Sequence, residues 1–269
     1  MKFIRLFMGE LRRIIANPIY VAMTVLIALC YYFSGYEEVL TVRHSGWDGV
    51  PWADVLYFFT MTQQFGFFTS ISVIACAVVT SFSFIEDFEC RYSNFIISRC
   101  SKDGYIAAKF LAVSFAGGLL LAGGIFAYIM MLRVEFPLIA ENSIALSNYM
   151  NMIDNAFLAI ALQNDNYIMY FATYVLFAFL FGALWSSVGL AMSTVINNKF
   201  VAAFTPYILL HLNTLLFHGT KFKVETIFRA NYSFGNFESS LIYGIGFFTI
   251  LIIICGVWFR SGAIRRIKN

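Results

Sequence analysis

The apolar residues of this chain gather in six long runs that are separated by short polar segments. The runs lie near residues 18–34, 58–84, 107–132, 168–195, 200–217 and 240–259. A helix needs roughly 20 apolar residues to cross the hydrocarbon of a bilayer, and a helix that is apolar on every face has no place on the surface of a soluble protein. The pattern therefore predicts an all-α integral membrane protein with six transmembrane helices.

A shorter, amphipathic segment at residues 2–16 precedes the first run. Its apolar side chains recur at helical spacing, at Phe3, Phe7, Leu11 and Ile14. Its charged side chains occupy the rest of the helical wheel, at Lys2, Arg5, Glu10, Arg12 and Arg13. The Asn17-Pro18 pair that follows disfavours helix and predicts a turn. We expect an interfacial elbow helix that lies on the membrane surface, with its apolar side toward the lipid. A disordered basic tail is the alternative.

Composition supports one membrane domain over residues 1–269. Hydrophobic residues make up 60% of the chain and charged residues 12%, whereas soluble domains have roughly 45–50% and 25%. The six spans and their connections use nearly all of the length, so we expect no appended catalytic module. Because the basic start is long and amphipathic, and no small-residue cleavage pattern follows the first run, we expect that run to be retained as a span and not removed as a signal peptide.

The basic residues gather on every second connection. If the N-terminus is cytoplasmic, most of the 18 basic residues lie inside: Lys2, Arg5, Arg12, Arg13, Arg91, Arg99, Lys102, Lys109, Lys199, Arg260, Arg265, Arg266 and Lys268. The positive-inside rule then predicts that both termini are cytoplasmic, which agrees with an even number of spans. A bacterial plasma membrane is the expected location. Residues 133–167, on the other side, predict one or two short helices, and residues 218–239 predict a cap over the outer end of a pathway.

Several kinds of chemistry have no sequence signal. The chain has no G-x-x-x-x-G-K-[ST] segment, so any use of ATP needs a partner chain. No H-E-x-x-H occurs and no two cysteines stand at C-x-x-C spacing, so we expect neither a metal site nor a catalytic residue. No Asp or Glu lies in the middle of a predicted span, which argues against an ion-coupled carrier. His211 lies within the fifth span, where we expect a neutral imidazole bonded to a neighbouring helix.

The connection between the second and third spans is the most highly charged part of the chain. Residues 85–109 contain the charged residues Glu86, Asp87, Glu89, Arg91, Arg99, Lys102, Asp103 and Lys109. An apolar group at Phe95, Ile96 and Ile97 lies between them. A short helix that presents an apolar tip and charged flanks to another protein has this pattern. A solvated inner loop that obeys the positive-inside rule has it too.

These features together resemble the permease subunit of type-2 ABC exporters. The first part of the match comprises Glu10, Arg12-Arg13, Asn17-Pro18, the acidic group at the inner end of the second span, Ser98-Arg99, Tyr105 and Lys109. The second part comprises Ser186, Ser187, Ser193, Asn197-Asn198-Lys199, Ala202-Ala203 and Pro206. In that family, the segment matching residues 86–103 is a cytoplasmic coupling helix that docks on a separate ATPase subunit.

The resemblance implies an ATP-driven transporter with two permease chains, identical or different, and two ATPase chains that hold ATP and Mg. The implied contacts with the ATPase are Glu86, Asp87, Glu89, Arg91, Phe95, Ser98, Arg99, Tyr105 and Lys109; the implied elbow residues are Arg5, Glu10, Arg12 and Arg13. The expected cargo is hydrophobic or amphipathic, namely a peptide antibiotic, a drug or a lipid. We expect no nucleic-acid partner. A membrane scaffold or sensor without transport, and an intramembrane enzyme, are the alternatives.

Overall fold

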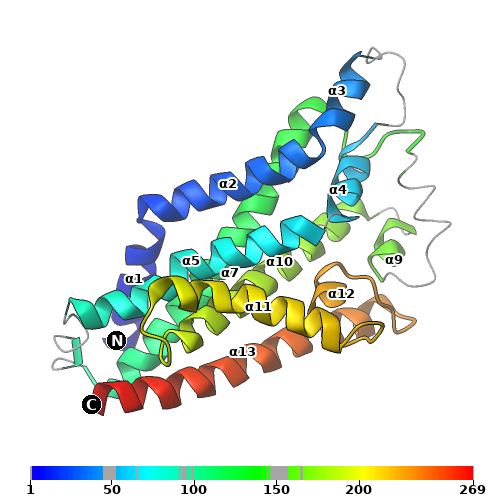
Figure 1. Ribbon diagram of the computed structural model, residues 1–269. Helices are drawn as coiled ribbons and strands as arrows, with labels where there is room; N and C mark the ends of the chain where they lie inside the picture. The colour runs from blue at the N-terminus through cyan, green and yellow to red at the C-terminus, as the bar shows by residue number, and fades with distance from the viewer. Residues whose placement is uncertain are drawn as a thin grey trace.

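Every element in the described part of the chain is a helix. The computed structural model describes residues 2–44, 53–64, 66–90, 92, 96–97, 100–143, 145, 157–163 and 166–268. Its principal helices are α1 (Lys2–Ile15), α2 (Pro18–Ser34), α3 (Tyr36–His44), α4 (Val55–Gln64), α5 (Gly66–Glu89), α7 (Lys102–Glu135), α9 (Leu158–Gln163), α10 (Tyr167–Met192), α11 (Lys199–Leu216), α12 (Val224–Phe228) and α13 (Phe237–Lys268). Figure 1 shows the long helices running side by side, with both chain termini at the same end of the bundle.

Five of the described helices are long and apolar enough to cross a membrane. They are α5 from Thr69, α7, α10, α11 and α13. Helix α2, at the place of the first predicted span, has 17 residues, and it adds a sixth crossing only if α1 and α2, which are bent by 61°, form one broken span. The apolar helices indicate a membrane protein, as the sequence predicts.

The helix boundaries differ from the predicted spans at several places. The run near 58–84 comprises α4 and α5, and residue 65 between them lies outside the described residues. Helix α13 continues to Lys268, past the predicted end of its span. Its last turns contain basic residues, which are good helix formers and favour the C-terminal end of the helix dipole. Two of them are also held by neighbours, because Arg260 pairs with Asp103 at 3.0 Å and Arg266 bonds to Ser193 and Asn197.

Helices α7 and α10 form the centre of the bundle. Helix α7 packs against α1, α2 and α10, and α10 also packs against α5 and α13. The two central helices meet at glycines. A Cβ atom on Gly182 would lie 2.5 Å from the carbonyl oxygen of Gly117, and a Cβ atom on Gly117 would lie 1.7 Å from the Oγ of Ser186. Only glycine permits so close an approach.

The peripheral helices α11 and α13 expose apolar side chains. On α11 these include Leu215 and Leu216, and on α13 they include Ile242 and Val257. Buried side chains make up only a small share of either helix, in contrast to α7 and α10. Outward-facing apolar residues on long helices are expected when lipid is the solvent.

Helix α1 uses part of its apolar face for contact with its own chain. Phe7 packs edge-to-face on Phe115 of α7, with 6.5 Å between ring centroids, and Ile14 is 4% exposed. Phe3 is exposed, as are Ile4 and Met8 on another side of the helix. The sequence assigns Phe7 and Ile14 to the lipid side, whereas the fold packs them against the bundle. The interfacial position of α1 stays a prediction.

The connections at the end opposite the termini contain short helices. Helix α9 lies within the segment 133–167, where the sequence predicts one or two short helices; residues 146–156 of that segment lie outside the described residues. Within residues 218–239, α12 packs its Phe228 face to face on Phe181 of α10, with 4.2 Å between ring centroids. The connection therefore lies directly against the central helix.

Candidate functional site: a buried ion cluster

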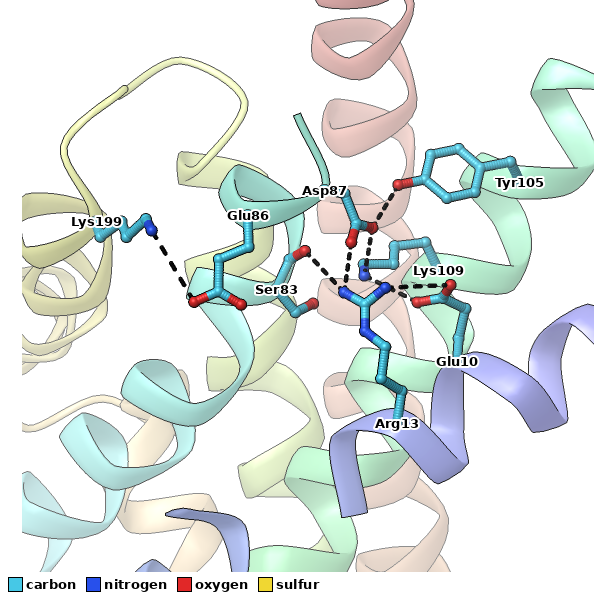
Figure 2. Close-up of polar contacts among 8 residues, drawn as sticks. All are labelled: Glu10, Arg13, Ser83, Glu86, Asp87, Tyr105, Lys109 and Lys199. Atoms are coloured by element: carbon cyan, nitrogen blue, oxygen red, sulfur yellow. Dashed lines mark hydrogen bonds and ion pairs between the residues drawn. The ribbon is translucent and has the colours of Figure 1, made fainter. Parts of the chain in front are cut away.

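Five polar side chains from three helices meet at the end of the bundle that holds both termini, here called the charged end. Glu10 and Arg13 come from α1, Asp87 comes from the last turn of α5, and Tyr105 and Lys109 come from the start of α7. Figure 2 shows the five side chains pointing toward one another. We call this group the buried ion cluster.

Lys109 is at the centre of the cluster. Its ammonium group lies 2.9 Å from Oε2 of Glu10 and 2.7 Å from Oδ2 of Asp87. The hydroxyl of Tyr105 donates to the same Asp87 oxygen at 2.6 Å. Arg13 pairs with the other oxygen of Asp87 through Nη2, and its Nη1 lies 3.8 Å from Oε1 of Glu10. Each carboxylate therefore contacts both cations.

The cluster is enclosed by the fold and its formal charges balance. Lys109 is 0% exposed and both carboxylates are 1% exposed, whereas Arg13 reaches the surface with 37% of its side chain exposed. Burying charges is costly unless each is paired and hydrogen-bonded. The two cations and two carboxylates together have a net charge of zero, so each buried charge has a partner. Removing any one of the four leaves an unbalanced charge in the cluster.

Local sequence places these side chains on matching faces. Tyr105 and Lys109 are four residues apart, and Glu10 and Arg13 are three apart, so each pair lies on one side of its helix. Asn17 follows α1 and caps the start of α2: its Oδ1 accepts a hydrogen bond from the amide of Ile19 at 3.0 Å. Pro18 occupies the first turn of α2, where a missing amide hydrogen costs nothing. The resulting bend turns α1 toward α7.

Arg13 stays charged throughout the physiological range. Burial lowers the pKa of its guanidinium, but the carboxylates of Asp87 and Glu10 raise that pKa by more, so the net shift is upward. The guanidinium also lies over the ring of Tyr92, 4.7 Å from its centroid. These contacts hold Arg13 between the cluster and the segment that follows α5.

Exposed ion pairs also lie at the charged end of the bundle. Lys199, at the start of α11, lies 2.6 Å from Glu89 and 4.0 Å from Glu86, both at the end of α5. Arg260 of α13 pairs with Asp103 of α7 at 3.0 Å. Because these side chains are partly or largely exposed, each pair contributes little stability. They do connect α11 and α13 to the helices that carry the cluster.

The structure divides the predicted contacts with an ATPase into three groups. Asp87, Tyr105 and Lys109 are buried and face their own chain, so they present no surface to a partner in this conformation. Glu86 and Glu89 are exposed and pair with Lys199. The remaining four predicted contacts lie outside the described residues: Arg91, Phe95, Ser98 and Arg99. Of the predicted coupling helix, residues 86–89 belong to α5 and residues 102–103 to α7, and residues 91, 93–95 and 98–99 lie outside the described part of the chain.

The predicted elbow residues also separate. Arg5 and Arg12 are exposed, whereas Glu10 and Arg13 belong to the buried ion cluster. Sequence reasoning treated the elbow and the inner connection as two sites and missed that they meet. One signal was present. Lys109 stands inside the third apolar run, and an ionised side chain there needs a buried partner of opposite charge.

Polar residues on α10 and α11 also make structural contacts. Ser187 of α10 bonds to Ser114 of α7 at 2.7 Å, and Asn198 caps α11 by accepting from the amide of Phe200 at 3.0 Å. His211 packs edge-to-face on Tyr207, with 4.5 Å between ring centroids. It also lines a cavity of about 590 Å³ between α5, α11 and α12.

Among the residues that the structure describes, no three His, Cys, Asp or Glu side chains come together in a way that could hold a metal ion. No family model matches the chain, and neither a curated protein nor a solved structure matches it. The buried ion cluster joins α1 to α5 and α7, the two helices that flank the most charged connection.

Proposed function

We propose that this chain is the permease subunit of an ATP-driven exporter of the type-2 ABC class, and that a separate ATPase subunit drives it. The observation that carries the proposal is the buried ion cluster. It lies at the base of the connection 90–101 and ties that connection's two flanking helices to α1. A subunit that is moved by a partner needs such a rigid joint beneath the docking segment.

The joint transmits force for a physical reason. A displacement of residues 90–101 acts first on the end of α5 and the start of α7. Because Asp87 and Lys109 share ion pairs with Glu10 and Arg13, neither helix shifts alone without leaving a charge buried and unpaired. The three helices therefore move as one body, and a change of packing elsewhere in the bundle opens the transport path.

The remaining parts of the proposal rest on the sequence. The chain lacks a phosphate-binding loop, so the ATPase with its ATP and Mg is a partner, and a second permease chain completes the transporter. Both termini lie at one end of the bundle (Figure 1). The distribution of basic residues predicts that this end is cytoplasmic, and the proposed membrane is a bacterial plasma membrane. The aromatic-rich spans suit a hydrophobic or amphipathic cargo: a peptide antibiotic, a drug or a lipid.

The test is purification of the tagged chain from its native membrane in mild detergent, with mass spectrometry and an ATP hydrolysis assay of what co-purifies. We expect a stoichiometric ATPase that carries the phosphate-binding loop. The charge reversal Glu86→Lys with Glu89→Lys changes the exposed acids beside the docking segment and is expected to release that partner. Glu37→Lys, an exposed acid on α3 at the opposite end, is the matched control.

A folded, monodisperse chain that brings down no ATPase would overturn the proposal. If the double reversal and the control both retained the ATPase, the end of α5 would not be part of the docking surface.

A further inference from the structure

A second polar site lies beside the buried ion cluster, in the angle between α1, α2 and α5. It is a cavity of about 300 Å³, with Arg13, Asn17, Ser83 and Glu86 among its lining residues. This volume is at the lower end of the range of ligand pockets. We call it the elbow pocket.

Ser83 gives the elbow pocket a polar group that the fold leaves unused. The residue is 8% exposed, its hydroxyl oxygen is fully buried, and that oxygen has no hydrogen-bond partner within the described part of the chain. Its backbone carbonyl, by contrast, accepts from Nη2 of Arg13 at 3.4 Å. Figure 2 shows Ser83 on one side of Arg13 and Glu10 on the other. A buried hydroxyl without a partner is unfavourable, so a bound polar ligand would relieve a cost.

Two further donors line the same space. Arg13 is partly exposed and offers more N–H groups than its carboxylate partners occupy. Asn17 uses its Oδ1 to cap α2, which leaves its Nδ2 group as a donor to a ligand. The amino terminus of α2 adds a partial positive charge at this point. Residues with a guanidinium, an amide and a hydroxyl therefore line one cavity, and these groups suit the acceptor oxygens of a phosphate.

Glu86 gives the pocket a carboxylate as well. It is 51% exposed, and its closest cation, Lys199, stands 4.0 Å away while lying nearer to Glu89. A simple anion would be repelled by this carboxylate, whereas a ligand with a phosphate and an ammonium group satisfies both charges of the pocket.

The apolar part of the lining lies along one helix. Val78, Val79 and Phe82 precede Ser83 and Glu86 on α5, so the lining changes from apolar to polar toward the charged end of the bundle. Ile19 of α2 also lines the pocket and is largely exposed. An amphiphile whose head lies at Ser83 would place its chains along this apolar part and the lipid-facing side of α2.

We propose that the elbow pocket binds the headgroup of an aminophospholipid such as phosphatidylethanolamine. Its phosphate lies among Arg13, Asn17 and Ser83, and its ammonium group lies at Glu86. The lipid occupies the angle at which α1 meets α2, so it supports the bend that places Glu10 and Arg13 in the buried ion cluster. Binding of the lipid requires neither transport nor the proposed ATPase partner, so it is tested separately from the proposed function.

The test is native mass spectrometry of the full chain from nanodiscs that contain phosphatidylethanolamine, phosphatidylcholine and phosphatidylglycerol in equal amounts. The wild type is expected to retain one phosphatidylethanolamine in preference to the other two lipids. Ser83→Ala removes a hydroxyl that bonds to nothing else in the described chain, so it should leave folding unchanged and reduce retention by at least about tenfold.

Two further variants separate headgroup binding from folding. Asn17→Asp keeps a good cap for α2 but replaces the amide donor with a carboxylate, so it is expected to lose the lipid while the helix stays intact. Asn198→Asp makes the same change at the cap of α11, outside the pocket, and is expected to retain the lipid. Glu86→Gln is expected to abolish the preference for phosphatidylethanolamine over phosphatidylcholine.

Soluble phosphoethanolamine, added at millimolar concentration, distinguishes the two sources of this chemistry. We expect it to compete weakly, because it lacks the acyl chains that the apolar lining contacts. Equal retention of all three lipids by the wild type and Ser83→Ala would overturn the proposal. Tight binding of phosphoethanolamine without any retained lipid would show that the pocket binds a soluble compound and not a lipid, and would overturn the proposal.

Discussion

Among the described residues, ion pairs between different helices lie at the charged end of the bundle, whereas the ion pairs of Glu225 at the opposite end stay within residues 223–229. At the charged end, Lys109 bridges two carboxylates from other helices at 2.9 and 2.7 Å. At the opposite end, here called the aromatic end, rings pack on rings. Phe59 of α4 contacts Tyr174 of α10 with 4.6 Å between centroids, and Phe228 of α12 stacks on Phe181.

The difference concerns how each end responds to displacement. Ring contacts are individually weak and accept several geometries, so a helix can shift among them at small cost. Buried ion pairs depend on every member, because losing one leaves another charge without compensation. We therefore expect the helices at the charged end to move as a unit, and the helices at the aromatic end to shift relative to one another.

Removing the central cation should have the largest effect. Lys109→Met leaves two buried carboxylates with Arg13 as their remaining cation, so we expect a loss of about 3–5 kcal/mol in the free energy of unfolding. The measurement is unfolding by SDS titration in mild detergent, followed by circular dichroism. Lys102→Met, at an exposed position on the same helix, is the control and should change little. A Lys109→Met protein as stable as this control would contradict the cluster's role.

A change at the helix crossing between the two ends should come next. Gly182→Ala places a methyl group against the backbone of Gly117, so α7 and α10 must separate, at an expected cost of about 1–3 kcal/mol. Gly246→Ala on α13 meets no atom within 4 Å and is expected to stabilise its helix by about 0.5–1 kcal/mol. The same titration compares the two. A Gly182→Ala protein that gains stability would show that the helices do not meet so closely.

A change at the aromatic end should be milder than one at the charged end. Phe59 contacts four rings, those of Tyr128, Tyr170, Phe171 and Tyr174. Phe59→Leu keeps an apolar side chain there, so we expect a loss of only about 1 kcal/mol. If this loss equalled that of Lys109→Met, the proposed contrast between the ends would fail.

The exposed ion pairs at the charged end should matter least. Glu89→Gln removes the contact with Lys199 at 2.6 Å between partly exposed side chains, which is expected to cost less than about 1 kcal/mol. Raising the salt concentration to 0.5 M should abolish the difference from the wild type, because salt screens exposed charges. A difference that persists in high salt would indicate that this pair is shielded from solvent.

The sequence predicts the helical class and most helix positions, because long apolar runs specify membrane helices locally. It does not predict the length of α13, which depends on neighbouring helices. It identifies Glu10, Arg13, Asp87, Tyr105 and Lys109 as notable residues but separates them into two sites. Their meeting depends on the 61° bend between α1 and α2, and no local spacing encodes which helix a bend will approach.

The unused hydroxyl of Ser83 had no sequence signal at all. Serine is common in helices, where its hydroxyl often bonds to the preceding turn, as that of Ser187 does with Ala183 at 2.7 Å. Only the packed structure distinguishes Ser83, which makes no such bond in the described chain, from its neighbours.

The most direct test of the central claim, that the buried ion cluster joins α1 to α7 as one body, is a double-mutant cycle between Glu10 and Lys109. The cycle compares the unfolding free energies of Glu10→Gln, Lys109→Met and the double variant by SDS titration. We predict a coupling energy of at least about 1.5 kcal/mol, with the double variant more stable than the sum of the two single losses implies. Losses that add within about 0.5 kcal/mol would show that the two residues act independently, and would contradict the account.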